Sequence, residues 1–445
     1  MYEQLEVLGY QAIDRGLIPD WILRRLIRFS CSLRIKELDS PSLEELHRRK
    51  LSFIDSLRSL PVALHQSRAN EQHYEVPTEL MTSCLGQYMK YSCCYFPKMS
   101  ESLDEGEVLM LQDYCEKAKV EDGLDILDLG CGWGSLSLFL AQRYPNAKIT
   151  ALSNSRTQKA HIDQVAKHRQ LNNLTVLTDD VMVFDFPSDH AKFDRIISIE
   201  MLEHMKNYEF LFKKISTWLK PEGLFFAHIF CHRDQPYHFE EKDGWMAQNF
   251  FSGGTMPSLD LFAYFQRDLN LERSWYINGK HYSRTAELWL TKLDQARSVW
   301  TGEMQLLQVM KLQSLDQDLA SREIHKNFFK FRTFFLAVAE FFGLNDGQTW
   351  GVGHYLFSKK ALQSSTPNNN QLKNPLKCSW VWLHLKELND QTIAVCKVIT
   401  KLGKICGKCL KKDKSGSTKD LDAHLSLFHN MAISYQEYQS KSCQF

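Results

Sequence analysis

The spacing of apolar residues changes along this chain and divides it into segments. Residues 1–70 carry apolar positions three or four apart, which predicts amphipathic helices. Between about 124 and 230, short apolar runs alternate with amphipathic stretches, the rhythm of strands separated by helices. The predicted strands are 124–128, 148–152, 174–177, 195–199 and 224–230, with helices at 136–143 and 156–169. Residues 256–345, rich in Trp and Phe, are predicted to be mostly helical, and 364–371 is a polar stretch without periodicity, typical of a linker.

Strands that alternate with helices in this way pack as a parallel sheet covered on both faces. The sequence therefore predicts an α/β, Rossmann-like, doubly wound sheet with helical additions at its N-terminus and over its substrate side. A chain of 445 residues is too long for one ordinary domain. We expect a helical extension at 1–70, a main domain at 71–362 and a linker at 363–376.

Composition narrows the class of protein. Hydrophobic residues at 44% and charged residues at 24% are typical of a soluble globular protein. No apolar run reaches the ~20 residues that span a bilayer, and the start lacks the pattern of a signal peptide. We therefore expect no transmembrane segment and a cytoplasmic protein, with the twelve cysteines reduced or bound to metal.

The last eighty residues differ from the rest in charge. Residues 366–445 hold 12 lysines against 6 acids, whereas the rest of the chain is net acidic. This tail is compositionally a separate module.

A glycine-rich loop follows the first predicted strand. Gly130, Gly132 and Gly134 stand at alternate positions directly after Asp128. Glycine allows the tight turn and the close approach of backbone to ligand that such a site needs. The G-x-G-x-G spacing differs from the G-x-G-x-x-G of dinucleotide-binding folds. The acid ahead of the glycines, Asp128, suits a ligand that carries an ammonium and a sulfonium group. The alternative is that the loop is rich in glycine for packing alone.

Several short stretches in a fixed order make residues from about 70 to 362 resemble one family, the coclaurine N-methyltransferase and cyclopropane fatty acid synthase family of class I methyltransferases. The stretches are 73–77, 90–96, 127–135, 153–158, 200–208, 253–258 and 279–285. The resemblance implies a class I methyltransferase fold and S-adenosylmethionine as cofactor.

The resemblance also implies roles for single residues around the cofactor. Tyr91 and Ser92 are expected to contact its methionine carboxylate, together with the backbone of Gly130. Asn154 and Gln158 are the candidates for the ribose hydroxyls, because this sequence has no acid at the end of its second strand. Asp180 is the candidate partner of the adenine amino group, and it could equally be a solvated turn acid.

The family's N-methyltransferases use a Glu-His pair to hold and deprotonate an amine, and in this sequence the pair is Glu203 and His204. An alkyl amine titrates near 10, so presenting it neutral costs roughly 4 kcal/mol unless a base assists. Glu200 is expected one helical turn earlier, where its charge could help. On composition alone, Glu203 could instead be an acid complementing a helix dipole, and His204 a packed surface residue.

A rival chemistry in the same family adds a methylene group to an alkene in a lipid chain with bicarbonate as base. Cys93, Glu203, His228 and Tyr282 are compatible with such a site. The segments 231–240, 251–255 and 332–350 resemble the coclaurine-like branch instead, so we favour methylation of a small amine. The candidate substrate contacts are Phe251, Tyr282, Trp350 and His228; aromatics such as these and Phe335 could bind a cation or simply fill the core.

The tail contains the pattern of a structural zinc site. Cys406 and Cys409 form a Cys-x2-Cys pair, followed after fourteen residues by His424 and His429. Residues 376–430 resemble a BED-type zinc finger, a DNA-associated module, which implies weak DNA binding and a nuclear location if the finger is functional. The match departs from the family because position 403 is Gly, so Cys396 or Cys409 would complete the set. We place the finger at 377–430 and a terminal tail at 431–445. A captured, inert transposon fragment is the alternative.

Overall fold

A computed structural model describes residues 2–61, 78–186, 193–240, 244–250, 253–298 and 317–360, and three short strands at 385–387, 393–396 and 409–411. The chain divides into two compact units, residues 1–361 and 362–445. Among the helices described, none is both long enough and apolar enough to cross a bilayer.

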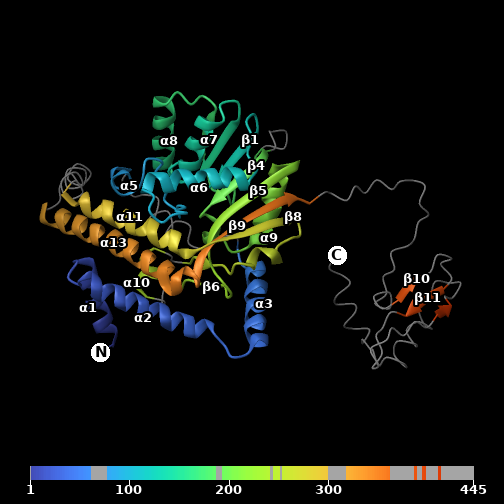
Figure 1. The fold of residues 1–445 in the computed structure, drawn as a ribbon, viewed down its shortest axis with the longest axis horizontal. Helices are drawn as coiled ribbons and strands as arrows, with labels where there is room; N and C mark the ends of the chain where they lie inside the picture. The colour runs from blue at the N-terminus through green and yellow to red at the C-terminus, as the bar shows by residue number, and fades with distance from the viewer. Residues whose placement is uncertain are drawn as a thin grey trace. The chain divides into compact units, whose positions relative to one another are not determined.

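A seven-stranded sheet lies at the centre of the first unit, with helices on both faces (Figure 1). Its strand order is β3-β2-β1-β4-β5-β9-β8. The first five strands are parallel, whereas β9 runs antiparallel to both β5 and β8. The bounds are β1 Asp125–Leu129, β2 Lys148–Ser153, β3 Leu174–Thr178, β4 Phe193–Ile199, β5 Leu219–His232, β8 Leu269–Ile277 and β9 Trp350–Lys359. The expected alternation of strands and helices is present, and the five predicted strands are parallel as expected. Two further strands, β8 and β9, make the sheet mixed.

The described part of residues 256–345 is mostly helical, as predicted. The strand β8 inside that range and the strand β9 after it were not predicted. The middle of β8 is exposed and polar, so it lacks the alternation that marks a half-buried strand. In β9, Gly351 and Gly353 interrupt the apolar pattern. A Cβ on these glycines would lie 2.4 Å from Tyr276 Oη and 2.3 Å from Tyr355 Oη respectively, so aromatic rings occupy the space that side chains would take.

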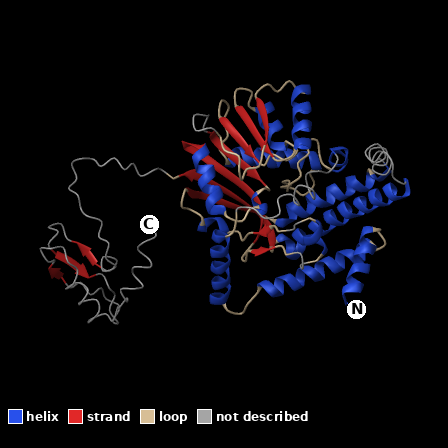
Figure 2. Cartoon of the chain, turned by 180° about the vertical axis from the view of Figure 1, so that it is seen from behind, coloured by secondary structure: helices blue, strands red, loops and turns tan. Residues whose placement is uncertain are grey.

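Helices cover both faces of the sheet (Figure 2). One buried cluster packs α3 and α9 against one face of the sheet, through side chains of β1, β4, β5 and β9. A larger cluster joins α6, α11 and α13 to the opposite face. The main helices are α1 Tyr2–Asp14, α2 Asp20–Leu38, α3 Leu43–Ser59, α5 Thr78–Cys84, α6 Leu103–Lys117, α7 Ser135–Arg143, α8 Arg156–His168, α9 Tyr208–Trp218, α10 Trp245–Asn249, α11 Gly279–Gln295 and α13 Gln317–Gly343. Short 3-10 turns are η2 Leu202–His204, η4 Leu261–Tyr264 and η5 Leu344–Gly347, and a two-stranded sheet pairs β6 Tyr237–His238 with β7 Thr255–Met256.

Arginine–carboxylate pairs fix α2 against the α11–α13 pair. Arg24 on α2 reaches Glu340 on α13 at 2.6 Å. Arg332 on α13 bonds Asp20 at the start of α2 at 2.6 Å and Asp294 on α11 at 2.7 Å. The Arg332 side chain is 18% exposed, so one planar, half-buried guanidinium joins three helices. The N-terminal helices therefore pack onto the same body as the sheet.

Arg332→Met should lower the free energy of unfolding of the chain by about 1–3 kcal/mol, because it removes charge-assisted bonds to two carboxylates. Arg49→Met is the matched control, since Arg49 bonds Glu45 within its own helix and is 47% exposed; a change within about 0.5 kcal/mol is expected. Denaturant unfolding of both variants checks this. Equal losses would contradict the assigned role of Arg332.

Candidate active site

The glycine loop lies at the carboxyl ends of the parallel strands, where ligands of such sheets bind. Gly130, Gly132 and Gly134 have φ values of +83°, +52° and +82°, which favour glycine at each position. A Cβ on Gly130 would lie 2.6 Å from Met201 Cγ, and one on Gly134 2.6 Å from Ile162 Cγ1. A Cβ on Gly132 would meet nothing within 4 Å. Two glycines thus permit close packing, and the third leaves backbone open to a ligand.

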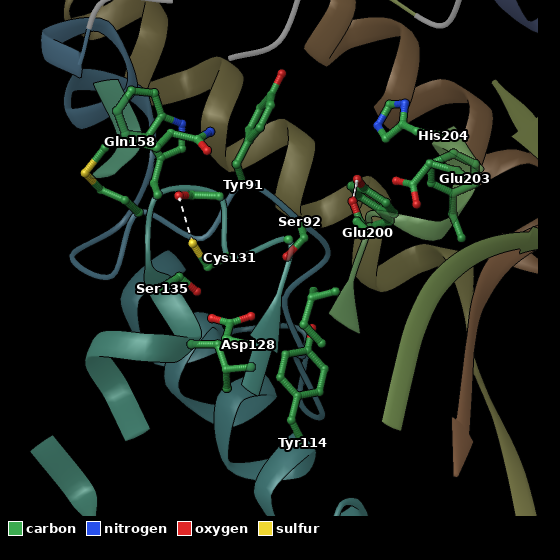
Figure 3. Close-up of a pocket in the computed structure, with 18 of the residues that line it drawn as sticks. Tyr91, Ser92, Tyr114, Asp128, Cys131, Ser135, Gln158, Glu200, Glu203 and His204 are labelled. Carbon is green, nitrogen blue, oxygen red and sulfur yellow. Dashed lines mark hydrogen bonds between the residues drawn. The ribbon is translucent and has the colours of Figure 1, made fainter. Parts of the chain in front are cut away.

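A cavity of about 900 Å³, including its open mouth, lies against this loop. Figure 3 shows Gln158, Cys131 and Asp128 on one side, Glu200, Glu203 and His204 on the other, and Ser92 between them. Its lining brings together residues that are far apart in the sequence. The predicted site residues in this lining are Tyr91, Ser92, Asp128, Gly130, Gly132, Gln158, Glu200, Glu203, His204 and Tyr282.

Asp128 is the acid on the cofactor side. Its side chain is 1% exposed, and its Oδ2 accepts a hydrogen bond from Ser137 Oγ at 2.5 Å. Burial raises the pKa of Asp128 to about 7. A cationic group placed against it would favour the ionised form, so the site suits a positively charged ligand.

Ser92 is held by a buried lysine. Lys90 is 1% exposed, and its Nζ donates to Ser92 Oγ at 2.5 Å and to the Cys93 carbonyl at 2.6 Å. An ammonium has donors only, so Ser92 Oγ accepts this bond and keeps its own hydrogen to donate. A ligand carboxylate is a natural acceptor for that hydrogen. The neighbouring Tyr91 ring lies 5.5 Å from the Trp289 ring, and both line the cavity.

Gln158 is positioned by the start of α8. Ser155 caps that helix by accepting from the Gln158 backbone N–H. Ser153 at the end of β2 donates its hydroxyl to Gln158 Oε1 at 2.7 Å. The Gln158 side chain is buried, and its Nε2 has no hydrogen-bond partner among the described groups. Unpaired buried donors are uncommon and point to a ligand acceptor.

Three predicted cofactor residues lie outside this lining. Gly134 caps α7 and packs against Ile162. Asn154 is exposed beyond the end of β2, and Asp180 lies in the turn after β3, where its Oδ1 accepts from the Met182 backbone N–H at 2.8 Å. Both stand at the strand edge that bears the cavity, so their assignments to ribose and adenine stay predictions.

Glu203 and His204 belong to η2, the 3-10 turn after β4, and both line the cavity. The Glu203 side chain is 3% exposed, and its Oε2 has no hydrogen-bond partner in the described part of the chain. Burial, and then the charge of nearby Glu200, raise the pKa of Glu203 well above its usual range. The lining therefore contains a carboxyl group that holds its proton tightly and has an oxygen available.

Glu200 does not lie one helical turn before Glu203, which corrects the prediction from sequence. It directly follows β4 and lies in the left-handed region with φ +46°, a strained position for a residue with a side chain. Three groups hold its carboxylate: the Cys93 backbone N–H at 3.0 Å, His228 Nε2 at 3.0 Å and the Tyr282 hydroxyl at 2.6 Å. Burial raises the pKa of Glu200, while the charge of buried Lys90 and the hydrogen bonds from Tyr282 and Cys93 oppose the shift. The side chain that follows the end of β4 is thus held by donors from three other parts of the chain.

The predicted substrate contacts separate into three groups. Tyr282 lines the cavity and stacks on Phe342, with ring centroids 4.4 Å apart. His228 and Trp350 do not line it: both are fully buried, His228 beneath Glu200 and Trp350 stacked on Phe341, and their roles as substrate contacts stay predictions. Phe335 is likewise fully buried in the core. Phe251 lies outside the described residues.

Several residues of the lining are not singled out by any motif in the sequence. Trp289 could have been predicted from the sequence, because it lies seven positions after Tyr282 and therefore on the same face of α11. Phe334 depends on how α13 packs, which periodicity does not decide. The residues not predicted are Met89, Tyr114, Cys131, Trp133, Ser135, Leu136, Ile199, Phe230, Trp289 and Phe334.

The predicted zinc ligands belong to the second unit. A three-stranded antiparallel sheet joins β10 Leu385–Glu387, β11 Ile393–Cys396 and β12 Cys409–Lys411, with Val395 opposite Cys409. Cys406, His424 and His429 lie outside the described residues. No cluster of three His, Cys, Asp or Glu suited to a metal occurs within the described segments. Zinc and DNA binding stay predictions from sequence.

Comparisons with known proteins agree with this geometry. A family model described as mycolic acid cyclopropane synthetase matches residues 63–311. An (S)-coclaurine N-methyltransferase from Thalictrum flavum subsp. glaucum is 38% identical over 352 residues, covering 78% of this chain and 94% of that enzyme.

Solved structures extend the likeness to three dimensions. A crystal structure of coclaurine N-methyltransferase bound to N-methylheliamine and SAH has a TM-score of 0.74 at 36% identity, covering 79% of this chain and 99% of that one. A cyclopropane synthase from Mycobacterium tuberculosis, 20% identical with a TM-score of 0.51 over 67% of this chain and 99% of that one, shares the fold. The predicted class I methyltransferase fold is thereby confirmed, with a mixed central sheet. The chain belongs to the mycolic acid cyclopropane synthetase family.

Proposed function

We propose that this protein is an S-adenosylmethionine-dependent N-methyltransferase of a small amine, with Glu203 as the base. The prediction of a methyltransferase is confirmed by N-methyltransferases matched over nearly their whole length. The observation that favours an amine acceptor is the buried Glu203 carboxyl, whose Oε2 has no partner among the described groups and which lines the cavity at the glycine loop.

The residues on the loop side fit S-adenosylmethionine. The open backbone at Gly132, the unpaired Nε2 of Gln158 and the available hydrogen of Ser92 offer places for polar groups of a ligand. Asp128 would face its positive charge, and Tyr91 would lie beside Ser92. When bound, this cofactor supplies an electrophilic methyl group. The protein's own task is then to align a nucleophile with it and to exclude water.

The amine must lose its proton to become that nucleophile. Glu203 is suited to accept it, because a carboxylate whose pKa is raised is a stronger base and lies nearer to the pKa of the amine. Glu200, fixed by three donors, keeps a negative charge beside it and so favours a cationic substrate. We assign His204 to contact the substrate from the same turn. Because their surroundings differ, Glu203 takes the role of the base and Glu200 that of a negative charge beside the substrate.

Aromatic rings from α11 and α13 line the same cavity. Tyr282 and Trp289 come from one face of α11, and Phe334 from α13. Tyr282 is perpendicular to Trp289, with ring centroids 6.3 Å apart. Such rings attract an ammonium by cation–π contact and accommodate an apolar substrate body.

The arrangement around Glu200 argues against the bicarbonate-dependent chemistry of the lipid-modifying branch. The Cys93 N–H, the His228 ring and the Tyr282 hydroxyl, all compatible with an anion site, donate to the Glu200 carboxylate. A carboxylate of the chain itself thus uses the donors that an external anion would need.

We keep the zinc site at Cys406, Cys409, His424 and His429 as a separate hypothesis for the C-terminal unit, with DNA binding dependent on it. It rests on the spacing of these residues and on the lysine excess alone. No step of the proposed reaction involves this unit.

Glu203→Gln should lower kcat by about 10²–10⁴, because it removes the proton acceptor and keeps the shape of the side chain. Binding of S-adenosylmethionine, measured by calorimetry, should be unchanged. Glu222→Gln, an exposed change at the far end of β5, is the control and should be fully active. Full turnover in Glu203→Gln would remove Glu203 from the mechanism.

Glu200→Gln should move the acid limb of the kcat/KM profile to lower pH. The negative charge of Glu200 raises the pKa of Glu203, so removing it lowers that pKa, and the ionised base persists further into acid. The pKa of the free amine is the same for both enzymes, so the shift reports on the protein. A limb displaced to higher pH would show that Glu200 does not act by repulsion.

Methylation of simple cyclic and aromatic amines should be independent of bicarbonate. Assays with labelled cofactor in carbonate-depleted and bicarbonate-supplemented buffer, run beside vesicles of unsaturated phospholipid, separate the two branches. Label in the lipid fraction, with stimulation by bicarbonate, would reverse the choice of an amine acceptor.

A further inference from the structure

A line of hydrogen-bonded side chains leads from Glu200 through the sheet to the protein surface. His228 Nε2 lies 3.0 Å from Glu200 Oε1, and His228 Nδ1 lies 2.8 Å from His354 Nε2. On its far side, His354 Nδ1 is 2.9 Å from Lys117 Nζ and 3.3 Å from Asp113 Oδ2. Beyond Glu200, none of these residues lines the candidate cavity.

The fold places the two histidines as partners. His228 on β5 and His354 on β9 are directly opposite in the antiparallel register, and their ring centroids are 4.8 Å apart. Both rings are fully buried, whereas Asp113 and Lys117, one turn apart on α6, are 21% and 12% exposed. Burial lowers the pKa of both histidines well below the usual range, so each is neutral. A neutral imidazole has one donor and one acceptor nitrogen, so the line of hydrogen bonds has a direction.

Lys117 decides that direction. Its ammonium donates to Asp113 Oδ2 at 2.7 Å and can only donate to His354 Nδ1. His354 must then carry its hydrogen on Nε2 and donate to His228 Nδ1. His228 in turn carries its hydrogen on Nε2 and donates to Glu200. The Tyr114 hydroxyl is 2.9 Å from His228 Nδ1 and shares the single lone pair of that nitrogen with the His354 Nε2–H.

We propose that Lys117 and His354 are positioning residues for the methyl transfer, which fix the tautomer of His228 so that its Nε2–H holds Glu200 as a carboxylate. This inference rests on the proposed function, since it concerns the charge that acts on Glu203. With the opposite tautomer, a lone pair of His228 would face the Glu200 oxygen. The carboxyl would then have to turn away or take up a proton, and either change removes its charge from Glu203.

The Tyr114 hydroxyl, as a donor to His228 Nδ1, favours the same tautomer of His228. The remaining charged and polar groups around these side chains do not set the order of the hydrogens. Within the described residues, Cys93 and Tyr282 donate to Glu200 itself, and Lys90 bonds the segment before α6. Asp113 alone would reverse the direction, because a carboxylate would accept from His354 Nδ1. Its longer distance from the ring, and the lysine that bonds both groups, favour the direction set by the ammonium.

The tautomers can be read directly in protein labelled with ¹⁵N-histidine, by two-bond proton–nitrogen correlation spectra. We expect His228 and His354 of the full chain to be Nε2–H. In Lys117→Met, Asp113 is the remaining partner at His354 Nδ1, so both rings should switch to Nδ1–H. Lys220→Met is the matched control: Lys220 also bonds two carboxylates, Asp125 and Asp194, far from the two histidines. Its spectrum should show no switch. Nδ1–H rings in the native protein, or no switch in Lys117→Met, would overturn the proposal.

Measurements of kcat then distinguish a positioning role of His354 from a role in packing alone. His354→Gln can place its amide nitrogen toward His228 and its oxygen toward Lys117, so it should retain most of kcat. His354→Leu and Lys117→Met should each lose on the order of tenfold in kcat, with thermal unfolding checked in parallel. Equal losses in the Gln and Leu variants would reduce His354 to a packing residue and contradict the proposal. If the native protein shows the expected tautomers but methylates no amine, the proposed function fails while the tautomer assignment stands.

Discussion

Two carboxyl groups buried beside one cavity are the constraint on which the rest of the site depends. Glu200 and Glu203 are close enough for the charge of one to raise the pKa of the other. Both cannot be ionised there without a large cost, so the fold must decide which one holds a proton. It provides three donors to Glu200 and leaves Glu203 Oε2 without a partner among the described groups. The asymmetry favours the charged form of Glu200 and leaves Glu203 as the group that takes up a proton, so Glu203 acts as a base when it is ionised.

The fold supplies this asymmetry through elements distant in sequence. The donors to Glu200 come from the segment before α6, from β5 and from α11. β9 contributes behind them, since its antiparallel pairing sets His354 opposite His228. The same α11 presents Tyr282 and Trp289 to the cavity, and arginines hold α11 and α13 against α2. Strand order, helix packing and the protonation of one carboxyl group are therefore linked.

The sequence predicts those parts of the site whose position depends only on residues nearby in the chain. The turn after β1, with its glycines, and the pair Glu203–His204 after β4 lie where the sequence indicates, because strand ends and tight turns are set by nearby residues. The sequence predicts that the charge of Glu200 could help, but the placement of Glu200 is beyond prediction from sequence, since it depends on a positive φ and on donors from three other elements. The sequence marks His228 as a candidate site residue, but only the pairing of β5 with β9 reveals its partner His354. Trp350 begins β9, a strand that the sequence pattern does not predict, and an aromatic residue beside a glycine does not reveal which face of a strand it occupies.

The proposed chemistry requires Glu203 to hold its proton far more tightly than an ordinary carboxylic acid while Glu200 stays charged. The direct measurement is the titration of the side-chain carboxyl carbons in protein labelled with ¹³C-glutamate, with the Glu203 signal assigned by its loss in Glu203→Gln. We predict that this signal reports a neutral carboxyl well above pH 4.5, the ordinary midpoint for glutamate. A Glu203 signal that titrates at or below that value would contradict the assignment of Glu203 as the base.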